Sequence, residues 1–204
     1  MPKLYFFHDP MCSWCWGYRP TSDELFSKLP PGIEKVDVLG GLAPDSDQPM
    51  PAEMRDFLSS TWRRIEGMLG TEFNHDFWTE CEPRRSTYPA CRAVLAAGRQ
   101  DHYNEMVDAV QRAYYLRAMN PSDTSTLEQL AAELDLDGKQ FAADLASTEL
   151  NDELMEQVQF AATSPIRGFP SLVFGDGDTL VPVKQDYLSA QATLEHLETL
   201  QKTG

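Results

Sequence analysis

The chain has 204 residues, of which 42% are hydrophobic and 24% are charged. These proportions are typical of a globular protein and exclude a disordered, collagen-like or coiled-coil chain. Seventeen Lys and Arg residues against 32 Asp and Glu residues leave a formal net charge of −15. That charge repels phosphate backbones and anionic lipids, so we expect no nucleic-acid partner and no membrane partner. No apolar run approaches the length of about 18 residues that a membrane span needs.

The N-terminus bears on the cellular compartment. An apolar run, Leu4–Phe7, follows the first three residues directly, and the first cysteine is already Cys12. A secretory signal needs a basic segment, an apolar stretch of about 7–15 residues and a cleavage site, and there is no room for these. We therefore expect a cytoplasmic protein, in which structural thiols are kept reduced.

The first forty residues predict a strand, a helix and a second strand. Leu4–Phe7 is a continuous apolar run, which is typical of a strand buried on both faces. The pattern from Ser13 to Leu29 suits a helix, and Pro30-Pro31-Gly32 ends it. Ile33–Leu39 then alternates apolar and polar residues as a strand does. Such a β-α-β unit is parallel and right-handed in nearly all proteins.

The middle of the chain is helical in its periodicity. Ser125 and Glu128 have the spacing of a capping box, which marks the start of a helix. Apolar residues recur at helical spacing in every segment between the two strand-forming regions. The predicted helices cover approximately residues 51–67, 88–98, 103–114, 125–134, 139–146 and 152–162.

Strand character returns near the C-terminus. Ser171–Phe174 and Thr179–Val183 flank a four-residue Gly/Asp loop, which predicts an antiparallel hairpin. A final helix is predicted at Gln185–Leu200. Each half alone would leave an unpaired sheet edge, so the two halves should form one mixed sheet with the helices inserted into it.

This order divides the chain into two predicted domains of an α/β protein. One domain comprises residues 1–45 together with 165–204 and contains the whole sheet. The other, residues 46–164, is an inserted α-helical domain. The sequence leaves the oligomeric state open.

The motif that carries chemistry is Cys12-Ser13-Trp14-Cys15. A C-x-x-C next to a β-α-β pattern indicates redox chemistry, whereas a zinc ribbon would need a second closely spaced pair. Cys81 and Cys91 are ten residues apart, so we expect no metal. These two are either inert thiols or a second redox pair.

The two cysteines of the motif should have different roles. Disulfide exchange needs a thiolate, and the free N–H groups and dipole of a helix start favour that form at Cys12. We expect Cys12 to be exposed and to attack. Cys15 lies one turn on, between Trp14 and Trp16, and should be more buried and resolve the mixed disulfide.

Each of three other positions allows two interpretations. His8, at the end of the first strand, either tunes Cys12 electrostatically or is a solvated or locally bonded turn residue. Pro20 either kinks the first helix or begins a separate one. The Phe169–Pro170 bond, before the third strand, is either trans, as most are, or cis, which would present the Phe169 backbone to an extended substrate.

Taken together, these features resemble those of a known family. The segment Asp9–Trp16, the late Gly168-Phe169-Pro170-Ser171 and the helical insertion between them are similar to the DsbA-like branch of the thioredoxin superfamily. The resemblance implies a thioredoxin-like fold with a large inserted helical domain. It also implies that Cys12 attacks, that Cys15 resolves and that Pro170 is a cis-proline beside them. Ser13-Trp14 replaces the Pro-His of the periplasmic oxidants, which argues against a strongly oxidising role.

The functional hypothesis is a thiol–disulfide oxidoreductase that needs no cofactor. Its substrate would be a protein or glutathione-like thiol or disulfide, contacted by Trp14, Phe169 and Pro170. One alternative is a glutathione-dependent transferase or isomerase of the kappa-class type, although such relatives typically have a serine where Cys12 stands. Another is a non-enzymatic adaptor that binds a protein through its acidic helical domain.

Overall fold

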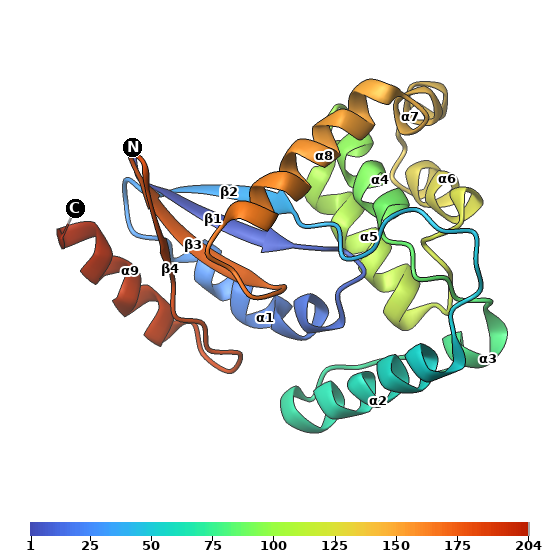
Figure 1. The fold of residues 1–204 in the computed structure, drawn as a ribbon, viewed down its shortest axis with the longest axis horizontal. Helices are drawn as coiled ribbons and strands as arrows, with labels where there is room; N and C mark the ends of the chain where they lie inside the picture. The colour runs from blue at the N-terminus through green and yellow to red at the C-terminus, as the bar shows by residue number, and fades with distance from the viewer. Residues whose placement is uncertain (204) are drawn as a thin grey trace. The chain divides into compact units, whose positions relative to one another are not determined.

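The computed structural model describes residues 1–203, in which a long helical stretch of sequence lies between two pairs of strands (Figure 1). The elements are, in chain order, β1 (Lys3–His8), α1 (Ser13–Ser27), β2 (Glu34–Leu39), α2 (Ala52–Leu69), α3 (Phe77–Glu80), α4 (Tyr88–Gly98), α5 (Tyr103–Leu116), α6 (Thr124–Glu133), α7 (Gly138–Leu145), α8 (Thr148–Thr163), β3 (Ser171–Asp176), β4 (Thr179–Pro182) and α9 (Gln191–Thr203). No helix in this described part is long and apolar enough to cross a membrane.

The strands form one mixed sheet. Over residues 1–203 the strand order is β2-β1-β3-β4. β1 pairs in parallel with β2 and antiparallel with β3, so that Phe7 lies between Val38 and Ser171. β3 and β4 form the predicted antiparallel hairpin. β1 is therefore a central strand, which explains why its sequence is apolar on both faces.

Each face of the sheet has its own apolar core. Successive side chains of a strand point to opposite faces. On one face, Leu4 and Phe6 of β1 pack with residues of α1 and α9, including Leu25 and Leu197. On the other face, Phe7, Val38 and Val173 pack with Ala161 and Phe160 of α8. The end of β1 is thus held rigidly between helices, and this end leads directly into the cysteine motif.

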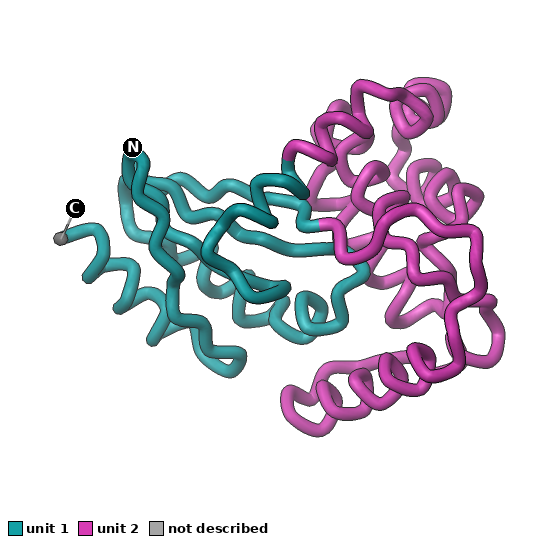
Figure 2. Tube along the Cα trace, viewed as in Figure 1, with its two compact units in different colours: residues 1–40, 157–204 teal, residues 41–156 magenta. Residues whose placement is uncertain are grey.

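The chain forms two compact units (Figure 2). One comprises residues 1–40 together with the chain from Gln157 onward and contains the sheet. The other, residues 41–156, contains α2 to α7 and the first part of α8. Trp62, which is fully buried, stands at the centre of an aromatic cluster in this second unit. Its ring neighbours are Phe73, His75, Phe77, Trp78, Tyr114 and Tyr115. The domain borders at residues 45 and 165 stay a prediction.

Several predicted element boundaries need correction. The last helix begins at Gln191 rather than Gln185, because residues 184–190 form a loop. In this loop an Asp186 carboxylate oxygen accepts a hydrogen bond from the Leu188 N–H at 2.8 Å. α6 begins at Thr124, so Ser125 lies inside the helix and does not start the predicted capping box. Pro20 lies inside one continuous α1 rather than beginning a new helix.

Candidate active site

A tight turn between β1 and α1 places Cys12 at the start of the helix. Asp9, which is fully buried, accepts two hydrogen bonds in this turn. Its carboxylate oxygen binds the Met11 N–H at 2.8 Å, and its carbonyl oxygen binds the Cys12 N–H at 3.0 Å. Cys12 is the N-cap residue of α1, next to the helix N–H groups that have no partner within the helix. Asp9 therefore holds the backbone of the turn that leads into Cys12 through both its side chain and its carbonyl group.

Both cysteines of the motif are buried, with 5% of Cys12 and 4% of Cys15 exposed. The expectation that Cys12 would be exposed was therefore wrong, because the turn and the segment around Phe169 cover it. Burial raises the pKa of the Cys15 thiol well above its usual value, and a hydrogen bond with the Cys12 sulfur raises it further. Cys15 is therefore a protonated thiol at neutral pH.

The Phe169–Pro170 segment lies directly against Cys12. The Cys12 thiol donates a hydrogen bond to the Phe169 carbonyl oxygen, with a sulfur–oxygen distance of 3.4 Å. The peptide bond between Phe169 and Pro170 is cis. The Ser171 hydroxyl donates to the Gly168 carbonyl at 2.7 Å and closes the turn. The Phe169 carbonyl oxygen thus accepts a hydrogen bond from the reduced Cys12 thiol, and contact between the Phe169 backbone and a substrate stays a prediction.

Gly40 makes room for the Phe169 ring. A Cβ atom at Gly40 would lie 1.9 Å from the Phe169 Cζ atom, which is far inside contact distance. The Gly40 N–H also donates to the His8 carbonyl at 2.7 Å, which holds this glycine at the end of the strand pair. Sequence reasoning did not use Gly40, because the ring it contacts comes from residue 169.

An aromatic group lies beside the cysteine motif. Trp14, between the two cysteines, is half-buried, and its ring centroid lies 5.4 Å from that of Tyr187 in an edge-to-face arrangement. The Tyr187 ring also packs edge-to-face on Tyr18, with centroids 5.1 Å apart. Tyr187 comes from the loop before α9, which was predicted as helix, so the sequence analysis missed it.

His8 is a buried strand residue, which corrects the interpretation of a solvated turn. It is 3% exposed and stacks on Phe6 with ring centroids 5.0 Å apart. Burial lowers the pKa of His8 from 6.5 to about 4, although Asp37 nearby opposes this shift. The imidazole is therefore neutral at pH 7 and supplies no positive charge to Cys12.

Cys81 and Cys91 lie outside this site, in the helical unit. The Cys81 thiol donates a hydrogen bond to the Ala118 carbonyl oxygen at 2.9 Å, and Cys91 is fully buried in α4. No disulfide joins any of the four cysteines, all of which lie in the described part of the chain. Within residues 1–203, no group of three or more His, Cys, Asp or Glu side chains is placed to hold a metal ion.

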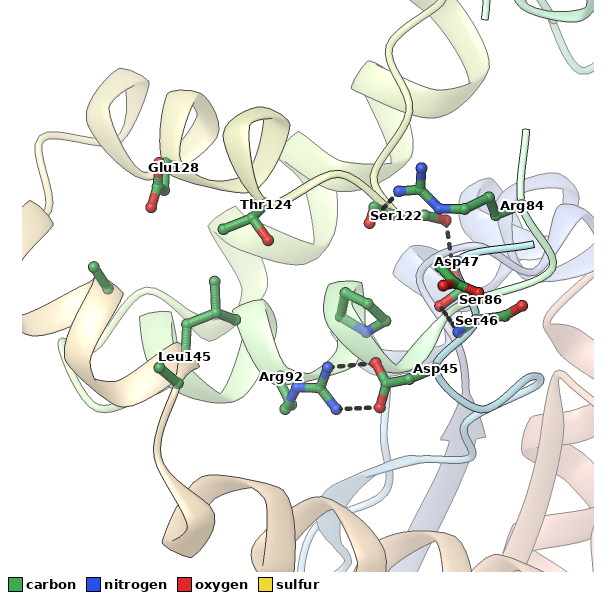
Figure 3. Close-up of a pocket in the computed structure, with 13 residues that line it drawn as sticks. Asp45, Ser46, Asp47, Arg84, Ser86, Arg92, Ser122, Thr124, Glu128 and Leu145 are labelled. Atoms are coloured by element: carbon green, nitrogen blue, oxygen red, sulfur yellow. Dashed lines mark hydrogen bonds and ion pairs between the residues drawn. The ribbon is translucent and has the colours of Figure 1, made fainter. Parts of the chain in front are cut away.

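The helical unit contains a cavity of about 680 Å³ that is lined by both polar and apolar residues (Figure 3). Arg92 on its wall forms a two-pronged ion pair with Asp45, with nitrogen–oxygen distances of 2.9 and 2.5 Å. Arg84 binds the Ser122 carbonyl oxygen at 2.8 Å and pairs with Asp123. Both arginines are thus neutralised by carboxylates of the protein itself.

The geometry at Cys12 agrees with what comparison with protein families finds. The family model described as DSBA-like thioredoxin domain matches residues 3–193. The chain belongs to this family. The predicted thioredoxin-like fold with a helical insertion is therefore confirmed.

Solved structures are similar over the whole length. A "putative protein disulfide isomerase from Nitrosomonas europaea" is 26% identical, with a TM-score of 0.86, and the match covers 100% of this chain and 99% of that one. The "cytosolic disulfide reductase DsbM from Pseudomonas aeruginosa" is 23% identical, with a TM-score of 0.78 and coverage of 99% and 100%. The second likeness shows the fold alone.

One relative is named as an adapter protein and not as an oxidoreductase. The ClpXP adapter protein SpxH of Bacillus subtilis (strain 168) is 26% identical over 176 residues. The match covers 84% of this chain, and it spans only 58% of the length of that relative.

Proposed function

We propose that this protein is a thiol–disulfide oxidoreductase in which Cys12 attacks and Cys15 resolves. The observation that carries the proposal is the contact between the Cys12 sulfur and the carbonyl oxygen of Phe169, 3.4 Å apart, next to Pro170. It brings together the motif and the late proline segment, which the sequence alone leaves far apart. Membership of the DSBA-like family supports the same chemistry.

The proposed reaction needs only thiols and disulfides. The Cys12 thiolate attacks one sulfur of a substrate disulfide, and the other substrate sulfur leaves as a thiolate that takes up a proton. Cys15 then loses its proton and attacks the Cys12 sulfur, which releases the second substrate thiol. The substrate has gained two electrons, and Cys12 and Cys15 have become a disulfide. A second dithiol or two molecules of a cellular thiol such as glutathione return the protein to its reduced form.

The direction we propose is reduction of substrate disulfides in the cytoplasm. A strong oxidant such as DsbA is one whose reduced form is stabilised. Here Ser13 and Trp14 are uncharged and His8 is neutral, so none of the three supplies a positive charge that would stabilise a reduced thiolate at Cys12. One structural neighbour is named a cytosolic disulfide reductase. Trp14 lies between the two cysteines in sequence and the Phe169–Pro170 segment contacts Cys12, so these three residues would contact a protein or glutathione disulfide.

Trapping of the mixed disulfide tests this proposal. Reduced Cys15→Ser should accumulate a covalent adduct when mixed with glutathione disulfide, because nothing resolves the bond at Cys12. Cys12→Ser should form no adduct at Cys15, because the raised pKa of Cys15 keeps it a protonated thiol. Intact mass after acid quenching measures both. Equal adducts in both variants, or none in either, would contradict the assigned roles, and full turnover by Cys15→Ser would instead indicate a glutathione transferase.

A second candidate function is that of an adaptor, which the name of the SpxH relatives favours. An adaptor binds its partner whether or not the cysteines cycle. Binding of purified ClpX to the wild type and to the double variant Cys12→Ser/Cys15→Ser, measured by calorimetry, tests this candidate. Equal affinity in both proteins would support an adaptor, and the absence of binding by both would exclude this form of it.

A further inference from the structure

Tyr187 lies on the side of α1 where the two cysteines and their neighbours are found. Trp14 and Tyr18 are four residues apart in α1, and Cys15 and Tyr18 are three apart, so these side chains share one side of the helix. The Tyr187 ring contacts both Trp14 and Tyr18, with centroid distances of 5.4 and 5.1 Å. It therefore spans the turn of helix that contains Cys15.

The loop that carries Tyr187 is fastened to α1 at the same place. The Thr21 hydroxyl donates a hydrogen bond to the Tyr187 carbonyl oxygen at 2.7 Å. Thr21 is buried, with 6% exposed, and Tyr187 is half-buried, so the bond is partly removed from water. The ring is held over α1 by its own backbone and not only by contact with its neighbours.

The electrostatics agree with a position close to both sulfurs. The pKa of Tyr187 is raised, first by burial and then by the charges that Cys15 and Cys12 carry when ionised. The Tyr187 side chain is therefore a neutral phenol at any pH at which the enzyme would work. An uncharged aromatic ring here excludes water from the sulfur that must lose a proton for the reaction to finish.

We propose that Tyr187 is a positioning residue that covers Cys15 and thereby sets how long the mixed disulfide at Cys12 survives. This inference rests on the proposed function. Release of the substrate requires Cys15 to ionise. Burial is the largest of the effects that raise the pKa of Cys15 and so oppose this ionisation. Removing the ring lets water solvate the thiolate, so resolution becomes faster and the substrate is released sooner. The ring thus gives a bound substrate time to exchange its disulfides before release.

The test follows the lifetime of the glutathione adduct after reduced protein is mixed with glutathione disulfide. Tyr187→Ala should shorten this lifetime about threefold for a decrease of one unit in the pKa of Cys15, because the tenfold larger thiolate fraction is partly offset by the lower nucleophilicity of the thiolate. Tyr187→Phe should keep the wild-type lifetime, because it retains the ring. Tyr187→Val should give an intermediate lifetime, and serves as the second variant if the alanine protein does not fold.

Tyr5→Ala is the matched control. Tyr5 is also half-buried, but it packs on Phe160 in the core on the other face of the sheet. This variant should keep the wild-type lifetime even if it lowers stability. A lifetime in folded Tyr187→Ala or Tyr187→Val equal to the wild type, or a Phe variant as fast as Ala, would overturn the inference. If Cys15→Ser forms no adduct at all, the proposed function itself fails, which is a separate result.

Discussion

The Cys12 sulfur lies 3.4 Å from the Phe169 carbonyl oxygen, although the two residues are 157 positions apart in the chain. Two turns produce this contact. In the turn after β1, the Asp9 carboxylate accepts a hydrogen bond from a backbone N–H. In the turn before β3, the Ser171 hydroxyl donates one to a backbone carbonyl. Because β1 and β3 are paired neighbours in the sheet, the two turns meet. The helical unit is inserted between them in sequence without interrupting this pairing.

Gly40 should be required for activity because of the ring it contacts. Gly40→Ala would place a Cβ atom 1.9 Å from the Phe169 Cζ atom, so the Phe169 segment must move. We expect the rate of disulfide exchange to decrease roughly ten- to a hundredfold, since small misplacements at a reacting centre have such effects. We expect stability to decrease by about 1–3 kcal/mol.

Gly67→Ala is the control for this prediction. Gly67 is exposed in α2, and a Cβ atom there would contact nothing within 4 Å. This change should leave the exchange rate unchanged and increase stability by up to about 1 kcal/mol, because alanine favours the helix. An exchange rate for Gly40→Ala equal to that of the control would show that the position of the Phe169 ring does not matter.

His8 should make the protein less stable in acid. Its pKa is about 4 in the folded protein against 6.5 in the unfolded chain, because burial favours the neutral imidazole. As the pH falls from 6.5 through 4, the unfolded chain binds a proton that the folded protein does not. The free energy of unfolding should therefore decrease by about 3 kcal/mol over this interval through His8 alone.

Urea denaturation of the wild type and His8→Gln at pH 7 and pH 4 measures this contribution. The carboxylates titrate in both proteins, so the difference between the two isolates His8. Parallel losses of stability in the wild type and the variant would contradict the burial of a neutral imidazole.

Cys81 should react slowly with alkylating agents at neutral pH. Its pKa is raised above 9.0 by partial burial and by the charges of Asp123 and Glu80. The rate of carboxamidomethylation should thus still be rising at pH 9. Glu80→Gln removes one of the opposing charges, so at pH 8 it should increase the rate. Peptide mapping by mass spectrometry measures the rate at each cysteine, and a rate that levels off below pH 8.5 would refute the prediction.

Much of the sheet can be predicted from the sequence, since local patterns are informative where neighbouring residues decide the structure. The apolar run at Leu4–Phe7 and the Gly/Asp loop after Ser171–Phe174 identify β1 and the β3–β4 hairpin within one or two residues. The start of the last helix was wrong by six residues, because a contact from Thr21 holds Tyr187 in a loop. A contact between residues so far apart in the chain leaves no mark on the local sequence pattern.

The residues of the candidate site that could be predicted are those that belong to a recognisable sequence motif. Cys12 and Cys15 stand out by their spacing, and the Phe169–Pro170 segment stands out through the family resemblance. Gly40 and Tyr187 carry no local signal, since each acquires its role from a residue more than a hundred positions away. The burial of Cys12 was missed for the same reason, because the covering segment comes from residue 169.

The most direct test of the proposed disulfide exchange is a redox titration of the wild-type protein in dithiothreitol and glutathione buffers that together cover the potentials of thioredoxin and of DsbA, with acid quenching and mass analysis of every cysteine. We expect one cooperative two-electron transition that converts Cys12 and Cys15 into a disulfide, while Cys81 and Cys91 remain thiols. We expect a midpoint nearer to the value of about −270 mV for thioredoxin than to about −120 mV for DsbA. If Cys12 and Cys15 stay reduced throughout, or if the disulfide forms elsewhere, the protein does not work as proposed.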